Sequence, residues 1–146
     1  ITMKNGDISN KGSYTIAFRI EDTIIKKNSK SGFSDFMRNF NRLYDYSIDV
    51  GAMSVINRLY RNYDYNIVLV ANSNNDNKSA IHSVLKKLPF CDCVYVNPSR
   101  VSEIETNLLI EEWEYYVDDN ERRRSKITSS SAVSLKDFLT TCMKVR

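Results

Sequence analysis

Short apolar runs alternate with segments of helical periodicity along most of this 146-residue chain, and that alternation restricts the folds open to it. The apolar runs at residues 14–20, 66–71, 93–96 and 113–117 have the length and the branched or aromatic content of strands. Neighbouring parallel strands need a crossover connection, which is usually a helix. Four rounds of strand and helix therefore predict an α/β fold with a doubly wound parallel sheet.

The segments between these runs carry apolar residues at i, i+3, i+4 and i+7, the spacing that places one apolar stripe on a helix. Pro89 is expected to end one helix, because proline has no N–H for the helical ladder. The tail from residue 129 predicts a short last strand and a terminal helix. The other predicted helices cover residues 33–44, 52–63, 79–88 and 102–112.

Length and composition fit one compact domain. With 42% apolar and 27% charged residues, the chain can bury a core, which disfavours a disordered class. Residues 1–13 are polar and glycine-containing, so they predict a flexible arm before a single domain at residues 14–146. No apolar run is long enough to span a bilayer and no export signal is evident. We expect a cytoplasmic protein that is monomeric by itself and does not bind membranes.

Metal, disulfide and cofactor chemistry find little support in the residue types. Cys91, Cys93 and Cys142 form no C-x-x-C pair, and His82 is the single histidine, which leaves too few soft ligands for a zinc site. We expect reduced, partly buried cysteines and a helix-surface position for His82. No cofactor is indicated.

Polar or charged residues follow the predicted strands, at residues 19–23, 71–73, 97–100 and 118–120. In an open parallel sheet, ligands bind beyond the carboxyl ends of the strands. These four segments are therefore expected to line one crevice.

The first strand end has the sequence Arg19-Ile20-Glu21-Asp22-Thr23. With ANSNN at residues 71–75 and YYVDDN at residues 115–120, it makes the chain resemble the haloacid dehalogenase (HAD) superfamily across residues 14–139. The family's first motif is D-x-D-x-T, with a nucleophilic, magnesium-binding first aspartate and a second aspartate that is general acid and base. The resemblance places Arg19, Glu21 and Thr23 at these motif positions and implies a HAD-like fold without a large cap domain.

The other HAD motifs match to different degrees. The Thr or Ser that ends the second-motif strand and binds phosphoryl oxygens corresponds to Ala71, with Ser73 two residues late. The third-motif lysine corresponds to Arg100, which preserves the charge. The metal-binding aspartate pair of the fourth motif corresponds to Asp118 and Asp119, the best match of the four.

Arg19 determines the chemistry that we expect. A guanidinium stays protonated and has no lone pair with which to attack phosphorus or bind a metal. Its charge also opposes a dication between the carboxylates. We therefore expect a pseudoenzyme without catalytic residues or metal, in which Arg19 pairs with Glu21, Asp118 or Asp119 and its removal destabilises the fold.

A register shifted by one residue would instead make Asp22 the nucleophile. Successive side chains on a strand point to opposite faces, so Asp22 is expected to face away from Asp118. Bending at the strand end would be needed to bring it into the crevice. We expect Asp22 to cap the following turn.

Basic residues cluster after the fourth strand and on the predicted helices. Such a run is most often a solvated face, and the alternative is a surface that contacts nucleic-acid phosphates or a protein partner. The formal net charge of +3 does not decide between these. Under the binding alternative, charge reversal at residues 122–124 would weaken binding and leave thermal stability nearly unchanged. The candidate contact residues are Lys26, Lys27, Arg58, Arg61, Arg122, Arg123, Arg124 and Lys126.

An inactive HAD scaffold predicts an interaction module, and the abundance of Asn, Tyr, Ile, Lys and Ser resembles early proteins of large lytic phages. The whole sequence is similar to a phage transcription terminator. That resemblance implies host RNA polymerase or double-stranded DNA as partners, in the host bacterial cytoplasm, with termination on unmodified DNA. One alternative is a magnesium-dependent phosphatase of nucleotides or nucleic-acid 3′ ends that uses Glu21 and Asp118. Another is a nucleotide sensor that holds phosphate through Arg19 and Arg100.

Overall fold

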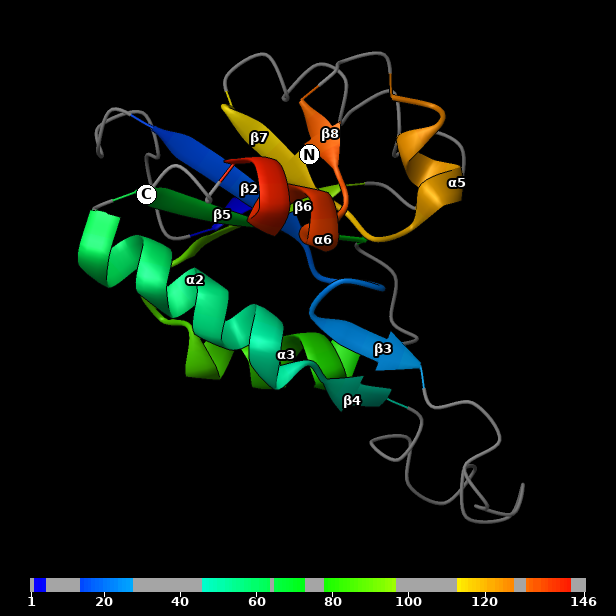
Figure 1. The fold of residues 1–146 in the computed structure, drawn as a ribbon. Helices are drawn as coiled ribbons and strands as arrows, with labels where there is room; N and C mark the ends of the chain where they lie inside the picture. The colour runs from blue at the N-terminus through cyan, green and yellow to red at the C-terminus, as the bar shows by residue number, and fades with distance from the viewer. Residues whose placement is uncertain are drawn as a thin grey trace.

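The computed structural model describes residues 2–4, 14–27, 46–63, 65–72, 78–96, 113–127 and 131–142. Within these residues, helices flank a sheet in an α/β arrangement (Figure 1). The helices are α2 (Val50–Tyr63), α3 (Lys78–Lys87), α5 (Glu121–Arg124), α6 (Leu135–Asp137) and the π-helical segment η4 (Phe138–Cys142). The strands are β1 (Thr2–Lys4), β2 (Thr15–Arg19), β3 (Ile25–Lys27), β4 (Tyr46–Ile48), β5 (Asn66–Asn72), β6 (Asp92–Val96), β7 (Tyr115–Val117) and β8 (Ala132–Val133).

The strand order of the main sheet changes direction beside β2. The described strands form a six-stranded sheet in the order β1-β6-β5-β2-β7-β8 and a separate β3-β4 pair. Neighbours from β6 to β8 are parallel, and β1 is antiparallel to β6. After β2, the chain adds β5 and β6 on one side and then β7 and β8 on the other. This Rossmann-like order confirms the predicted doubly wound parallel sheet, and its direction reverses between β2 and β7, where such sheets bind ligands.

Both faces of the central strands are covered, which explains their nearly continuous apolar sequences. Phe18 of β2 belongs to the core that includes buried residues of α2 and α3, whereas its neighbour Ala17 belongs to a second core with Trp113 and Tyr116. Figure 1 shows α2 and α3 on the same face of the sheet. On that face, the rings of Phe18 and Phe138 pack edge to face with centroids 6.0 Å apart, so η4 closes the core beside α2.

Asp49 caps the start of α2 and ties it to the turn after β2. Its Oδ1 accepts a hydrogen bond from the Ala52 N–H at 3.1 Å, and its own N–H donates to the Ile24 carbonyl at 2.7 Å. Burial alone raises the pKa of Asp49, but the Ala52 N–H and Lys26 outweigh it and hold the pKa below its usual value. The resulting stabilisation is present above the unfolded-state pKa of about 3.9 and is lost as the pH falls through the folded-state value.

The structure confirms some predicted elements and corrects others. The helices predicted at residues 52–63 and 79–88 are α2 and α3, and the tail forms β8 followed by α6. Within the predicted arm at residues 1–13, β1 pairs with β6, and three residues are too few to give a sequence signature. Residues 25–27, soon after the first predicted strand, form β3, which pairs with β4. The predicted helices at residues 33–44 and 102–112 lie outside the described residues.

The structure also bears on the positions expected for the cysteines and the histidine, and on membrane-spanning helices. Cys91 and Cys93 are buried in the core, and His82 is exposed on α3, in agreement with the sequence predictions. In the described part of the chain, no helix combines the length and the apolar character needed to cross a lipid bilayer.

Candidate functional site

The turn after β2 bends the chain away from the extended strand. The Ile20 carbonyl accepts hydrogen bonds from the N–H groups of Ile24 and Ile25, at 3.0 and 2.9 Å. All three isoleucines are buried, which anchors the turn in the core. Asp22, within this turn, has a φ of 70°, a left-handed conformation that aspartate adopts more readily than most residues.

Arg19, the last residue of β2, is fully buried at the carboxyl edge of the sheet. Its Nε donates to Oε1 of Glu21 at 2.8 Å, and its Nη2 donates to Oδ1 of Asn72 at 2.6 Å. Oε2 of Glu21 accepts from the backbone N–H of Asn72 at 2.8 Å. These bonds close a ring between the ends of β2 and β5 that uses both Glu21 oxygens. The predicted pairing of Arg19 with a crevice carboxylate is confirmed, and the partner is Glu21.

Arg19 remains a cation in this buried position. Burial alone lowers its pKa, but Tyr116, Glu21 and Asp118 raise it, and the net shift is upward. Its Nη1 is buried without a hydrogen-bond partner in the described residues. A buried unsatisfied donor costs stability, so the bonds from Nε and Nη2 must offset that cost.

Asp118 follows β7, on the other side of β2, and is also fully buried. Arg123 binds it with both ends of its fork, Nε to Oδ2 at 2.8 Å and Nη2 to Oδ1 at 3.1 Å. The Tyr116 hydroxyl donates to Oδ2 at 2.8 Å, and the Asn120 N–H donates to Oδ1 at 2.9 Å. Each carboxylate oxygen of Asp118 therefore accepts two hydrogen bonds from the protein. Burial and the neighbouring Asp118 raise the pKa of Tyr116, so its phenol stays a neutral donor.

Arg123 joins the ends of β2 and β7. The Asn120 side chain caps α5 by accepting a hydrogen bond from the Arg123 N–H at 2.9 Å. This bond fixes the position of the Arg123 backbone. Besides Asp118, its Nη2 donates to Oδ2 of Asp22 at 2.9 Å and to the Glu21 carbonyl at 2.9 Å. Burial alone lowers the pKa of Arg123, but Asp118 and Asp22 raise it by more. Arg123 is therefore a permanent cation within the crevice.

Asp119 is held by backbone groups and by a lysine. Its Oδ1 accepts from the Leu135 N–H at 2.7 Å, and its N–H donates to Oγ1 of the buried Thr23 at 2.9 Å. Its Oδ2 lies 3.5 Å from Nζ of Lys26, which also pairs with Asp49 at 3.2 Å. The Lys26 side chain is 45% exposed, so these two ion pairs contribute little to stability. Thr23 and Asp119 act here as links between the turn, β7 and α6.

The motif residues predicted from the sequence meet different outcomes. The ends of β2 and β7 bring together Arg19, Glu21, Thr23, Asp118 and Asp119 in one hydrogen-bonded cluster, as expected for residues of one site. Ala71 is buried in β5 without a side-chain polar group, and Arg100 lies outside the described residues. The residue after Ala71, Asn72, supplies both the amide oxygen and the N–H that hold the Arg19–Glu21 pair. Asn72 lies within the strand-end segment 71–73, but no individual role was predicted for it; the signal for that role is a polar residue directly at the end of an apolar strand.

The prediction that Asp22 faces away from Asp118 is wrong. Asp22 and Asp118 accept hydrogen bonds from the same Nη2 atom of Arg123. The prediction assumed that the strand continues, whereas the left-handed residue turns the side chain toward β7. Asp22 also accepts from Nδ2 of Asn120 at 3.0 Å, so it belongs to the charge cluster.

The basic run on α5 points partly inward, which corrects its predicted role as a free surface. The Arg123 side chain is only 15% exposed, and Nη1 of Arg124 donates to the Asp118 carbonyl at 2.6 Å. Charge reversal across residues 122–124 is therefore expected to destabilise the protein, contrary to the sequence prediction. Lys26 is paired with carboxylates, and the side chain of Lys27 is not described. The exposed members of the candidate set are Lys26, Arg58, Arg61, Arg122 and Lys126.

The residues in this crevice do not fit a magnesium ion. Magnesium prefers an octahedral set of oxygen ligands, but all four carboxylate oxygens of Glu21 and Asp118 already accept hydrogen bonds from the protein. Two guanidinium groups, from Arg19 and Arg123, lie among them. Across the described ranges, no three His, Cys, Asp or Glu side chains are grouped to hold a metal. In comparisons with protein-family models, curated proteins and solved structures, the chain finds no match.

Proposed function

We propose that this protein is a non-catalytic binding protein on a HAD-like scaffold. The observation that carries the proposal is the buried Arg19 at the position of the HAD nucleophile, bonded to the one carboxylate retained in that motif. Phosphoryl transfer through that position needs an ionised oxygen, which a guanidinium does not supply. The neighbouring Asp118 is likewise neutralised, by Arg123. The crevice then contributes to stability and shape, and the molecule acts through its surfaces.

Electrostatics disfavour the magnesium-dependent phosphatase as the alternative. Two unit charges ~4 Å apart interact with ~4 kcal/mol at an effective dielectric of ~20, and a dication doubles that repulsion from each guanidinium. A magnesium ion would also have to displace both arginines, which would break their hydrogen bonds to Glu21 and Asp118. Glu21 and Asp118 are the carboxylates such an enzyme would use, and both are engaged by the protein's own cations.

For the partner, we propose host RNA polymerase together with double-stranded DNA, in the bacterial host cytoplasm. The support is the similarity of the sequence to the Alc transcription terminator of T-even phages, which acts on polymerase elongating along unmodified, cytosine-containing DNA. The exposed Arg58 and Arg61 on α2 are compatible with contact to an acidic partner.

An affinity pull-down from bacterial extract tests this proposal. The immobilised protein is expected to retain RNA polymerase, and nuclease treatment shows whether DNA is required for that retention. The same preparation is expected to release no phosphate from nucleotides or 3′-phosphorylated DNA in magnesium. Loss of polymerase from both pull-downs would contradict the partner. Magnesium-dependent phosphate release that disappears in Asp118→Asn would contradict the absence of catalysis.

A further inference from the structure

The outer surface of α2 and α3 is basic and carries no carboxylate. Neither helix contains an aspartate or a glutamate anywhere along its length. Their basic residues are all exposed, in contrast to those of α5. We call this set the α2–α3 basic face, and it consists of Arg58, Arg61, Lys78, His82, Lys86 and Lys87.

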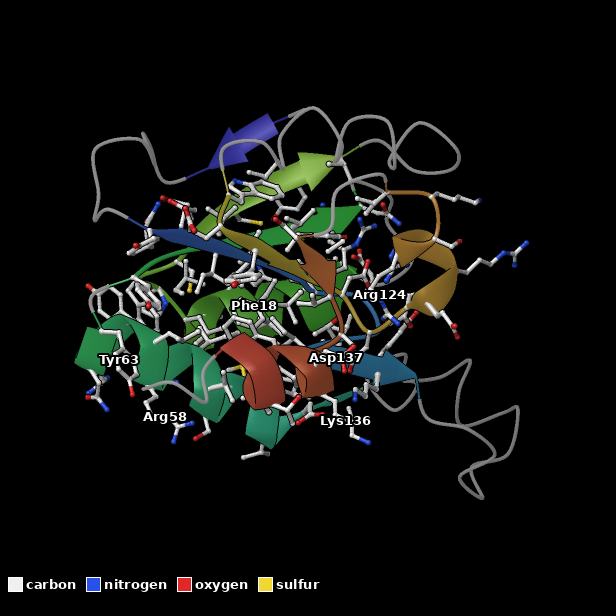
Figure 2. The ribbon with its side chains drawn as sticks, turned by 45° about the horizontal axis from the view of Figure 1, so that its top comes forward. Phe18, Arg58, Tyr63, Arg124, Lys136 and Asp137 are labelled. Carbon is white, nitrogen blue, oxygen red and sulfur yellow. The ribbon has the colours of Figure 1, made fainter. Side chains whose placement is uncertain are left out.

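Packing against the sheet directs these side chains outward. The buried residues of α3, Ala80, Ile81 and Val84, occupy one side of the helix and leave the other side to the cations. Figure 2 shows Arg58 on the side of α2 that faces away from the sheet. The ring of Tyr60 on α2 stacks on Phe90, just beyond α3, with centroids 4.2 Å apart. This contact links the carboxyl-terminal part of α2 to the segment that follows α3.

The part of this face on α3 is also hollowed. A shallow hollow of about 450 Å³ is lined by Lys78, Ser79, His82, Ser83 and Lys86. These positions form one stripe along the helix, and every one can donate a hydrogen bond. At a rise of ~1.5 Å per residue, the Cα atoms of Lys78 and Lys86 lie ~12 Å apart along the helix axis. A DNA strand carries a phosphate every ~3.4 Å of its axis, so the two lysines can reach phosphates about three base pairs apart.

We propose that the α2–α3 basic face binds the phosphodiester backbone of double-stranded DNA; the choice of DNA rests on the proposed function. A protein interface usually has an apolar or aromatic centre, and a membrane-binding helix has an apolar face. Among the described residues of these helices, Val50 and Tyr60 are the exposed large hydrophobic residues. Val50 lies at the opposite end of α2 from the cations, and Tyr60 is already stacked on Phe90. The face therefore offers charge and hydrogen-bond donors on a rigid support, which suits a backbone contact.

The test compares duplex binding by three proteins over a range of salt concentrations. Fluorescence anisotropy with a labelled 20-base-pair duplex measures the wild type, the Lys78→Ala/Lys86→Ala variant and a matched Arg122→Ala/Lys136→Ala control. The control removes the same charge from exposed positions outside the face. With ~0.9 counterions released per phosphate contact, losing two contacts makes the log–log salt slope shallower by about 2 and weakens binding roughly 50-fold at 0.1 M salt. The control is expected to keep the wild-type slope, and all three proteins the same melting temperature.

The outcomes separate this inference from the proposed function. If the wild type binds the duplex and the lysine variant binds it as tightly as the control variant does, the DNA surface lies elsewhere. Only the inference is then overturned. If the wild type does not bind at low salt, the inference and the DNA part of the proposed function both fail, while polymerase capture in nuclease-treated extract is unaffected. If the lysine variant keeps DNA binding but loses polymerase capture, the face is a protein interface and the inference is overturned.

Discussion

Replacing Arg19 with alanine is expected to lower the free energy of unfolding by about 3–5 kcal/mol, measured by urea denaturation. The substitution removes the cation from the ring formed with Glu21 and Asn72. Glu21 is only 8% exposed, so its carboxylate would stay in the protein interior without a countercharge. The cavity left by the largest fully buried side chain adds to the cost.

A double substitution tests whether the unpaired Glu21 charge and the lost volume together account for this cost. Arg19→Met/Glu21→Gln keeps most of the side-chain volume, removes both charges and retains an acceptor for the Asn72 N–H. Replacing a buried ion pair by uncharged groups of similar size is often neutral, so this variant is expected to recover most of the stability lost in Arg19→Ala. Equal loss in the two variants would show that the hydrogen bonds of Arg19 to Glu21 and Asn72, and neither the unpaired Glu21 charge nor the lost volume, make Arg19 necessary.

Replacing Arg123 with alanine is expected to cost about 2–3 kcal/mol in the same measurement. Asp118 is fully buried and loses both donors of the guanidinium fork. The bonds from Tyr116 and Asn120 remain, which limits the penalty below that expected for Arg19. The bridge from Asp118 to Asp22 is also lost.

The neighbouring Arg122 provides the matched control for this prediction. It lies on the same short helix, has the same side chain and is exposed. Arg122→Ala is expected to change stability by no more than about 0.5 kcal/mol, as is usual for an exposed position without special contacts. Similar melting of the two variants would refute the role of Arg123 as the internal countercharge of Asp118.

The sequence predicted the parts of the fold that depend on long periodic segments. β2, β5, α2 and α3 have enough residues for their burial pattern to be visible, and their order predicted the parallel sheet. β1, β3 and β4 have three residues each and are defined by the strand beside them, which local sequence does not encode. The pairing of Arg19 with a carboxylate was predictable because a buried cation needs a partner, but the sequence left Glu21, Asp118 and Asp119 open and the structure selects Glu21.

The rest of the site depended on backbone geometry and on contacts between distant segments. Asp22 was placed on the wrong side because its left-handed conformation follows from a turn that the sequence pattern presented as a strand end. Arg123 and Arg122 are indistinguishable in a basic run, and only the cap at Asn120 decides which of them faces Asp118. For the same reason α5 remained a candidate contact surface beside Arg58 and Arg61 of α2, whereas Arg123 and Arg124 bond to Asp118.

The neutralisation of the crevice carboxylates by the chain's own arginines is tested most directly by titrating the wild-type protein with magnesium in a calorimeter. The expected result is no saturable heat, and no rise in melting temperature at millimolar magnesium, because Arg19 and Arg123 already occupy the carboxylates that would bind the ion. Saturable binding of one magnesium ion that disappears in both Glu21→Gln and Asp118→Asn would contradict it.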